Sequence, residues 1–238
     1  MLGTLYLIPA PLADGLLSDT LPQGVLDLIP RLHYFVVEEL RTARRYLSKA
    51  GLKGDIDHLQ LFVFNEHTKP EELHTMLQPL LEGHDVGLLS EAGLPAVADP
   101  GAHLVALAHQ KGIKVVPLTG PSSLMLALMA SGLNGQSFAF VGYLPIDSGE
   151  RKARIRSLEK RAIQENQTQM FIETPYRNLA LFGDLLEVCA PHTMLCIAAN
   201  LTATDAFITS KSIIQWQHLP PPVIDKIPTL FLLGKSLC

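Results

Sequence analysis

Short apolar runs alternate with longer amphipathic segments along the first half of the chain. The short runs have the length of buried β-strands, and they lie at residues 3–9, 34–38, 59–65, 86–90 and 113–120. The segments between them have the spacing of helices, and they lie at residues 24–35, 41–50, 70–83 and 101–112. Because strands that alternate with helices form βαβ units, this half predicts an open α/β domain with a mainly parallel sheet.

The pattern changes at residues 117–123, PLTGPSS, where two prolines and a glycine interrupt the alternation. A helix is expected to follow, with Ser122 or Ser123 as its N-cap. The later segments are richer in strands and have shorter helices: we expect strands at 137–145, 169–175, 194–202 and 229–235, and a helix or turn at 206–216. We therefore predict two α/β domains, 1–117 and 118–238, the second with a mixed sheet.

Composition and charge restrict the class of protein. Of the 238 residues, 47% are apolar and 18% are charged, which is typical of a globular chain. There is no apolar run long enough to span a membrane and no basic stretch of a signal peptide at the start, so we expect a cytoplasmic protein. The net charge of −4 gives no overall attraction to nucleic acid. Any RNA contact must therefore come from a local patch, such as the basic helices at 41–49 and 150–161.

Several common catalytic motifs are absent from the sequence. The chain has no dinucleotide-binding G-x-G-x-x-G after the first strand, no phosphate-binding G-x-x-x-x-G-K-[ST], no G-x-S-x-G elbow and no zinc-binding H-E-x-x-H. We predict no metal site. Segments rich in glycine, proline and acidic residues instead follow the predicted strands. Since ligands of open α/β sheets bind at the carboxyl ends of strands, these segments predict one composite cleft.

Seven of these segments resemble, in order and spacing, the tetrapyrrole methylase superfamily of S-adenosylmethionine-dependent methyltransferases. They are GTLYLIPAPLAD, EELRTARRYL, NEHTK, LLSEAGLPAVADPGAHLV, VVPLTGPSSLMLAL, SGLNGQSFAFVGYLP and FIETPYR. They are most similar to the branch that methylates the ribose 2′-hydroxyl of a cytidine in 16S ribosomal RNA. The resemblance implies a two-lobed α/β enzyme, a homodimer, with S-adenosylmethionine held between the lobes largely by backbone contacts.

The resemblance also implies roles for individual residues. Cofactor contacts are expected from Pro11, Glu91, Ala92, Gly93, Ser122, Ser123, Glu173 and Thr202. Methyl transfer to a hydroxyl needs alignment and the removal of a proton, and the candidates for the base are Glu39 and Glu66. Substrate contacts are expected from Arg41, Arg151, Lys152, Arg154 and Arg177. Residues 90–98, SEAGLPAVA, are called the central loop. Asp99 and Pro100 are expected to be the N-cap and the first residue of the helix that follows this loop.

Several segments depart from the pattern of that branch. The chain has APLADGL, EELRTA, NEHT and ANLTA where the branch has ATPIGNL, EDTRHT, HEHN and RELTK. Because the altered positions include those expected to face the substrate, two alternatives remain open. One keeps the cofactor but takes a tetrapyrrole, another small molecule or a protein as the methyl acceptor. The other is a non-catalytic module that binds S-adenosylmethionine or RNA.

Overall fold

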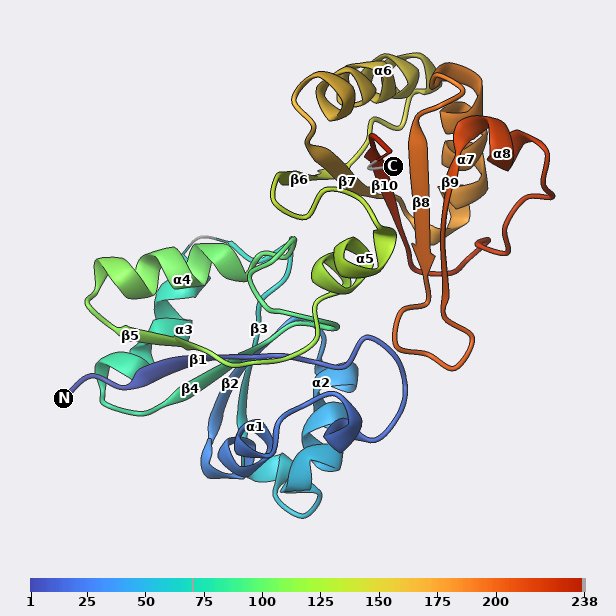
Figure 1. The fold of residues 1–238 in the computed structure, drawn as a ribbon. Helices are drawn as coiled ribbons and strands as arrows, with labels where there is room; N and C mark the ends of the chain where they lie inside the picture. Colours follow the sequence, from blue (N-terminus) through green and yellow to red (C-terminus); the bar gives the residue numbers. More distant parts are fainter. Residues whose placement is uncertain (70, 237–238) are drawn as a thin grey trace. The chain divides into compact units, whose positions relative to one another are not determined.

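A computed structural model of the chain describes residues 1–69 and 71–236. The chain forms two compact units (Figure 1): an N-terminal unit, Met1–Ser122, and a C-terminal unit that begins at Ser123. The sequence pattern placed the boundary after residue 117. The segment that follows β5 stays with the N-terminal unit because the Leu118 amide donates to the Leu7 carbonyl, 3.0 Å away.

The N-terminal unit is built on a five-stranded sheet in the order β3-β2-β4-β1-β5, and all neighbouring strands are parallel. Its strands are β1 (Thr4–Ile8), β2 (Tyr34–Val37), β3 (Gln60–Val63), β4 (Val86–Leu89) and β5 (Lys114–Pro117). Its α-helices are α1 (Gln23–Leu28), α2 (Leu40–Leu47), α3 (Glu72–Leu81) and α4 (Gly101–Gln110). Short turns of 3-10 or π-helix occupy Leu17–Asp19, Ile29–Arg31, Ser48–Leu52 and Ile56–His58. The predicted parallel α/β domain is confirmed.

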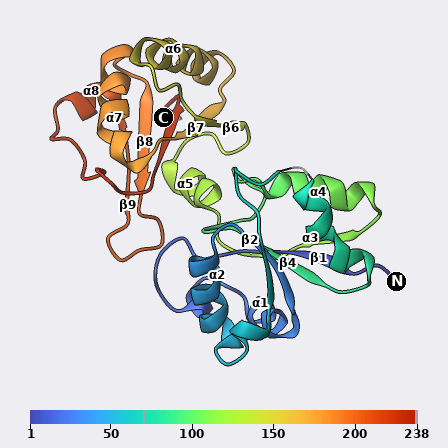
Figure 2. The same ribbon diagram turned by 180° about the vertical axis from the view of Figure 1, so that it is seen from behind.

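Helices cover both faces of this sheet, as a parallel sheet requires. On one face, strand residues such as Phe35 and Leu89 pack with apolar residues of α1 and α2. On the other face, Val36 and Leu88 pack with residues of α3 and α4. Figure 2 shows α1 and α2 on the opposite side of the sheet from α3 and α4. The strands are therefore buried on both sides, and their loops at the carboxyl ends are left to bind a ligand.

The start of α4 differs by one residue from the expectation. The helix begins at Gly101, and its N-cap position is Pro100 rather than Asp99. Asp99 still satisfies two backbone donors, because its carboxylate accepts hydrogen bonds from the amides of Gly101 at 2.8 Å and Ala96 at 2.7 Å. The side chain thus closes the central loop as well as the helix end.

The C-terminal unit contains the predicted mixed sheet, in the order β6-β7-β10-β8-β9. Its strands are β6 (Phe138–Tyr143), β7 (Thr168–Ile172), β8 (Met194–Ala199), β9 (Phe207–Ser212) and β10 (Thr229–Gly234). Its helices are α5 (Ser123–Ser131), α6 (Ser148–Gln164), a 3-10 turn (Pro175–Arg177), α7 (Asn178–Val188) and α8 (Ile213–Gln217). Strands β6 and β7 are parallel and the remaining pairs are antiparallel. Helices α6, α7 and α8 pack into one shared core with the sheet.

The prediction of a helix or turn at 206–216 was wrong for its first half. Residues Phe207–Ser212 form the edge strand β9, which pairs antiparallel with β8 from Phe207 opposite Ala199 to Ser212 opposite Met194. The β-branched Ile208 and Thr209 favour a strand. The helix begins only at Ile213, where Ser212 and Gln215 form a capping box.

Two further observations concern membranes and thiols. Within the residues that the structure describes, no helix combines the length and the apolar character that a membrane span needs. Cys189 and Cys196 are buried free thiols, and Cys238 lies outside the described residues.

Candidate functional site at the strand ends of the N-terminal unit

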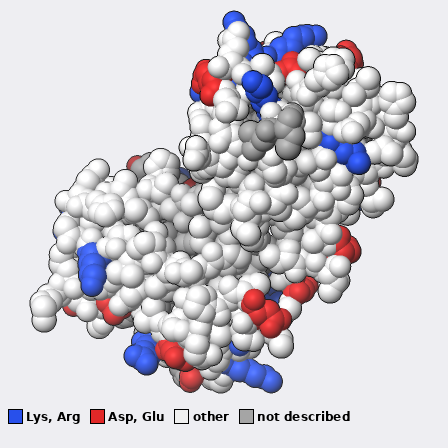
Figure 3. Space-filling model, viewed as in Figure 1, with Lys and Arg blue, Asp and Glu red and all other residues white. Residues whose placement is uncertain are grey.

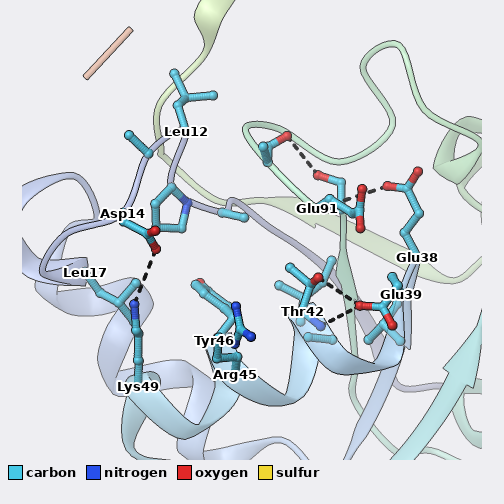
Figure 4. A pocket seen from close by; sticks show the side chains of 18 of the residues that line it. Leu12, Asp14, Leu17, Glu38, Glu39, Thr42, Arg45, Tyr46, Lys49 and Glu91 are labelled. Atoms are coloured by element: carbon cyan, nitrogen blue, oxygen red, sulfur yellow. Dashed lines mark hydrogen bonds and ion pairs between the residues drawn. The ribbon is translucent and has the colours of Figure 1, made fainter. Parts of the chain in front are cut away.

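A pocket of about 370 Å³ lies at the carboxyl ends of β1, β2 and β4 (Figure 4). The connection from β1 leads to β2 on one side of the sheet, and the connection from β4 leads to β5 on the other side. Loops that leave adjacent strands in opposite directions open a crevice between them, which is where open α/β sheets bind ligands. The pocket has the size of a small-molecule site, and the sequence-predicted cleft is represented here by three of its segments.

The loops after β1 and β4 are joined to each other beside the pocket. The amide of Ala10 donates to the carbonyl of Gly93 at 2.8 Å, and the amide of Gly93 donates to the carbonyl of Ala10 at 3.0 Å. Gly93 has a φ of 76°, and a Cβ at this position would lie 3.3 Å from Cδ2 of Leu12. A side chain would strain this bridge, which is the physical reason for glycine in the central loop.

The central loop is also strained beyond this glycine. Ala96 and Ala98 have φ values of 65° and 61°, a region that residues with a Cβ rarely adopt. The Asp99 carboxylate holds the Ala96 amide. Strain of this kind persists only where surrounding contacts impose it, and it concentrates at ligand-binding loops.

One face of α2 forms the wall of the pocket. Glu39 is the N-cap of this helix: its carboxylate accepts hydrogen bonds from the amides of Arg41 at 2.8 Å and Thr42 at 2.7 Å, and from the Thr42 hydroxyl at 2.8 Å. These bonds, those from the two amides most of all, lower the pKa of Glu39. Its carboxylate therefore stabilises the helix start, and its lowered pKa makes it a weak proton acceptor.

The residues that follow Glu39 along this wall recur with helical spacing. Thr42, Arg45, Tyr46 and Lys49 all line the pocket, because positions three, four and seven apart share one face of a helix. Figure 4 shows these side chains in a row along α2 and the turn that follows it. The Tyr46 hydroxyl donates to the carbonyl of Pro9 at 2.9 Å and so ties the helix to the end of β1.

The two ends of the pocket carry opposite charge. Glu38, Glu39 and Glu91 lie at one end, and the Glu91 amide donates to Oε2 of Glu38 at 3.3 Å. Burial raises the pKa of Glu91, and the charges of Glu38 and Glu39 raise it further. At the other end, Arg45 and Lys49 supply two positive charges and Asp14 one negative charge (Figure 4). The pocket therefore suits a ligand that has both proton-donating and anionic groups.

The structure brings some of the predicted site residues to this pocket and leaves others outside it. Glu39, Pro11, Glu91 and Ala92 line it, with Gly93 next to them in the chain. The other predicted base and the predicted arginine do not line it: the Glu66 side chain is 84% exposed beside His67 after the edge strand β3, and Arg41 contributes its backbone amide to the cap.

Sequence reasoning missed several lining residues, among them Glu38, Arg45, Tyr46 and Lys49. The signal was available, because the last three follow a strand end at helical spacing and so share the face that begins at Thr42.

Three predicted cofactor residues, Ser123, Glu173 and Thr202, lie in the C-terminal unit, and the last two have an unusual local geometry. Oε1 of Glu173 accepts hydrogen bonds from the Thr174 amide and from Nη2 of Arg177, both at 2.6 Å. Oε2 of Glu173 is buried and has no hydrogen-bond partner among the described residues. Thr202 has a φ of 70°, an outlier for a β-branched residue. Ser122 and Ser123 lie where the two units join, and α5 begins at Ser123.

The basic residues of α6 divide into buried and exposed groups. Arg151 is buried: its Nε and Nη2 lie 2.6 Å from Oδ2 of Asp184, and its Nη1 donates to the carbonyl of Ile146 at 2.7 Å. Lys152 pairs with Glu187 at 2.6 Å. The structure thus uses both predicted substrate residues for internal contacts.

The exposed group on α6 has no internal ion-pair partner among the described residues. Arg154, Arg156 and Lys160 are exposed and form no ion pair with any described residue. Figure 3 shows Lys and Arg side chains gathered at the top of the view, where α6 lies. Arg177, also predicted to contact substrate, is instead paired with Glu173 at 2.6 Å.

The described residues contain no group of three or more His, Cys, Asp or Glu side chains placed to hold a metal ion.

Comparisons with known proteins place the chain in a family. The sequence profile of the Tetrapyrrole (Corrin/Porphyrin) Methylases matches residues 12–213. Among curated proteins, the chain is similar to Ribosomal RNA small subunit methyltransferase I of Vibrio cholerae, with 34% identity over 84% of this chain and 65% of the relative. It is also similar to the protein of that name from Haemophilus influenzae, with 31% identity over 89% of this chain and 70% of the relative. The protein of that name from Escherichia coli O157:H7 is 32% identical over 85% of this chain and 66% of the relative. The chain therefore spans about two thirds of the length of these relatives.

A solved structure supports the fold. The methyltransferase CobJ matches 98% of this chain and 95% of its own chain with a TM-score of 0.65, at 17% sequence identity. At that identity the likeness concerns the fold alone. With the family profile matching residues 12–213, the chain belongs to the tetrapyrrole methylase family.

Proposed function

We propose that this chain transfers a methyl group from S-adenosylmethionine to the ribose 2′-hydroxyl of a cytidine in small-subunit ribosomal RNA. The observation that carries the proposal is the pocket at the carboxyl ends of β1, β2 and β4 in a chain whose curated relatives, 31% to 34% identical, are named ribosomal RNA methyltransferases. The fold agrees with a methyltransferase but does not select the acceptor.

S-adenosylmethionine, when bound, supplies a methyl group that its sulfonium makes electrophilic. The residues that we propose to hold it are the predicted set: Pro11, Glu91, Ala92, Gly93, Ser122, Ser123, Glu173 and Thr202. Two observations fit this group. Gly93 has a φ of 76°, which disfavours a side chain, and without one its backbone is open to close approach. The buried Oε2 of Glu173 lacks a partner in the described chain, so it would accept a hydrogen bond from a hydroxyl or amino group.

The acceptor hydroxyl must lose a proton, and we propose Glu91 as the carboxylate that accepts it. Glu39 is a poorer candidate because its oxygens already cap α2 and its pKa is lowered. Glu66 does not line the pocket. Glu91 lines the pocket and its pKa is raised, which brings its basicity closer to that needed for general base catalysis near neutral pH.

We propose that the RNA contacts the exposed face of α6 through Arg154, Arg156 and Lys160. Phosphate contacts of this kind release counterions, so binding should weaken steeply with salt. Arg151 is excluded from this surface because its guanidinium is buried against Asp184.

We also propose that the chain acts as a homodimer in the cytoplasm. The C-terminal unit exposes large apolar side chains that a partner would cover, among them Met129, Tyr143 and Ile146. Sedimentation equilibrium tests this directly: a monomer at micromolar concentration would contradict the dimer.

The proposed function is tested by the destination of the methyl group. The purified chain is incubated with S-adenosylmethionine labelled in its methyl group and with small ribosomal subunits from cells that lack this gene. We expect the label in the RNA fraction, at one site. Label in protein or in a small-molecule fraction would favour a different acceptor, and calorimetric binding of S-adenosylmethionine without any transfer would favour a non-catalytic module.

A further inference from the structure

The cationic end of the N-terminal pocket is not explained by cofactor binding or by the fold. Arg45 lines the pocket and is exposed, and its side chain forms no hydrogen bond or ion pair with any described residue. Its neighbour Arg44 is outside the pocket and has a partner, Asp57, at 3.5 Å. A cation that faces a cavity without a counter-charge is placed to meet a ligand anion.

Lys49 lies one helical turn beyond Arg45 on the same wall of the pocket. Its only ion pair among the described residues is with Asp14, at 3.8 Å, and the side chains are 49% and 106% exposed. A pair this long and this exposed contributes little stability. Figure 4 shows Asp14 on the loop after β1, opposite Lys49 at the rim of the pocket. Asp14 thus holds Lys49 only weakly, and a stronger anion would displace it.

We propose that Arg45 and Lys49 bind a backbone phosphate of the RNA strand next to the nucleotide that is methylated. The proposal rests on the proposed function and names the part of the same pocket that positions the substrate. Arginine and lysine are the usual phosphate ligands, and a guanidinium forms paired hydrogen bonds with phosphate oxygens. The acidic end of the pocket repels phosphate, so the charge pattern sets one direction for the strand: phosphate toward Lys49, reacting sugar toward Glu91.

The loop after β1 then acts in substrate selection. Asp14 competes with the phosphate for Lys49 and places a negative charge at the rim. This carboxylate lowers the affinity for every anion and leaves strong binding to ligands that also contact Arg45. Removing it should therefore tighten phosphate binding, an effect that misfolding does not produce.

The test measures binding of a fluorescein-labelled cytidine-containing oligoribonucleotide by anisotropy across a salt series. We expect Arg45→Gln to weaken binding about tenfold, as expected for one charged hydrogen bond, and to reduce the salt slope by about 0.7. Arg44→Gln is the matched control, because it removes the same charge one residue away, outside the pocket. We expect Asp14→Asn to tighten binding, whereas Asp19→Asn, which is outside the pocket, should change it much less. An oligonucleotide with a neutral methylphosphonate backbone should bind wild type and Arg45→Gln alike.

The outcomes separate this inference from the proposed function. Equal affinities of Arg44→Gln and Arg45→Gln, or a wild-type chain that does not bind the oligoribonucleotide, would overturn the phosphate site, and methyl transfer to RNA would then still support the proposed function. Binding that depends on Arg45 without any methyl transfer would support the phosphate site and remove the catalytic proposal. Thermal unfolding of each variant confirms that the fold is intact before affinities are compared.

Discussion

Arg151 and Arg154 lie on the same helix, and we predict that Arg151 stabilises the fold through its pair with Asp184 whereas Arg154 binds RNA. Arg151 and Asp184 are each less than one-tenth exposed, and the Arg151 guanidinium contacts Oδ2 of Asp184 through Nε and Nη2 at 2.6 Å. In Asp184→Ala the guanidinium stays buried without its counter-charge. Breaking a buried pair in this way costs about 3–5 kcal/mol of unfolding free energy.

The expected change in melting temperature follows from the size of the C-terminal unit. A domain of this length has an unfolding entropy that converts 1 kcal/mol into roughly 4 °C, so the transition of this unit should fall by about 12–20 °C. Differential scanning calorimetry of the full chain measures it. The matched variant is Arg154→Gln on the same helix, which should leave the transition within about 2 °C and weaken RNA binding instead. A shift of a few degrees or less in Asp184→Ala, or an unchanged RNA affinity in Arg154→Gln, would refute this division of roles.

Three further changes test the pocket, and one tests the core. Glu39→Gln should keep the rate of methyl transfer within a few-fold of wild type and lower stability at neutral pH. Because the pKa of Glu39 is lowered in the folded chain, its carboxylate stabilises the fold above the unfolded pKa of 4.5, and this stabilisation is lost as the pH falls through the folded pKa. A turnover reduced a hundredfold would make it the base after all. Glu91→Gln should raise stability at neutral pH and abolish most turnover. The gain in stability is expected because the raised pKa of Glu91 in the folded chain means that folding disfavours its charged form above pH 4.5. Denaturation at pH 4 and pH 7 measures the stability and a transfer assay the turnover, and an unaffected rate would remove Glu91 from catalysis. Gly93→Ala should reduce S-adenosylmethionine affinity in calorimetry, because its φ of 76° and the contact with Leu12 strain any side chain; unchanged affinity would contradict the role of this loop. Burial raises the pKa of the Cys189 thiol to about 12. In a Cys238→Ser variant the native chain should therefore react only slowly with thiol reagents, and fast labelling of Cys189 would contradict the buried core.

Most of the element order was predictable from sequence because apolar strands alternate with amphipathic helices, except that β8 is followed directly by β9. The strand order was not, and it decides which loops meet. Glu66 follows a strand that resembles the others in sequence, but β3 lies at the sheet edge, two places from β4 and three from β1. Its carboxylate therefore stays outside the pocket. β9 was missed for a related reason, since an edge strand has a weaker apolar pattern than a central one.

The contacts of single side chains could not be predicted from local sequence patterns either. Arg151 was counted with its basic neighbours, yet it lies at helical spacing from the buried Ile155, Leu158 and Ala162, which marks it as part of the inner face. Its partner Asp184 comes from α7, a contact that no local pattern reveals. Glu39 was a candidate base, but an acidic residue directly before a helix is also the pattern of an N-cap, and that is the role the structure gives it.

The proposed activity of this chain is the methylation of RNA at a ribose oxygen. Mass spectrometry of nucleosides from small-subunit RNA, taken before and after incubation with the chain and S-adenosylmethionine, tests it most directly. We predict the appearance of 2′-O-methylcytidine, absent when Glu91→Gln replaces the wild-type chain. A methyl group found on a base, or no new methylated nucleoside while S-adenosylmethionine is consumed, would contradict the account.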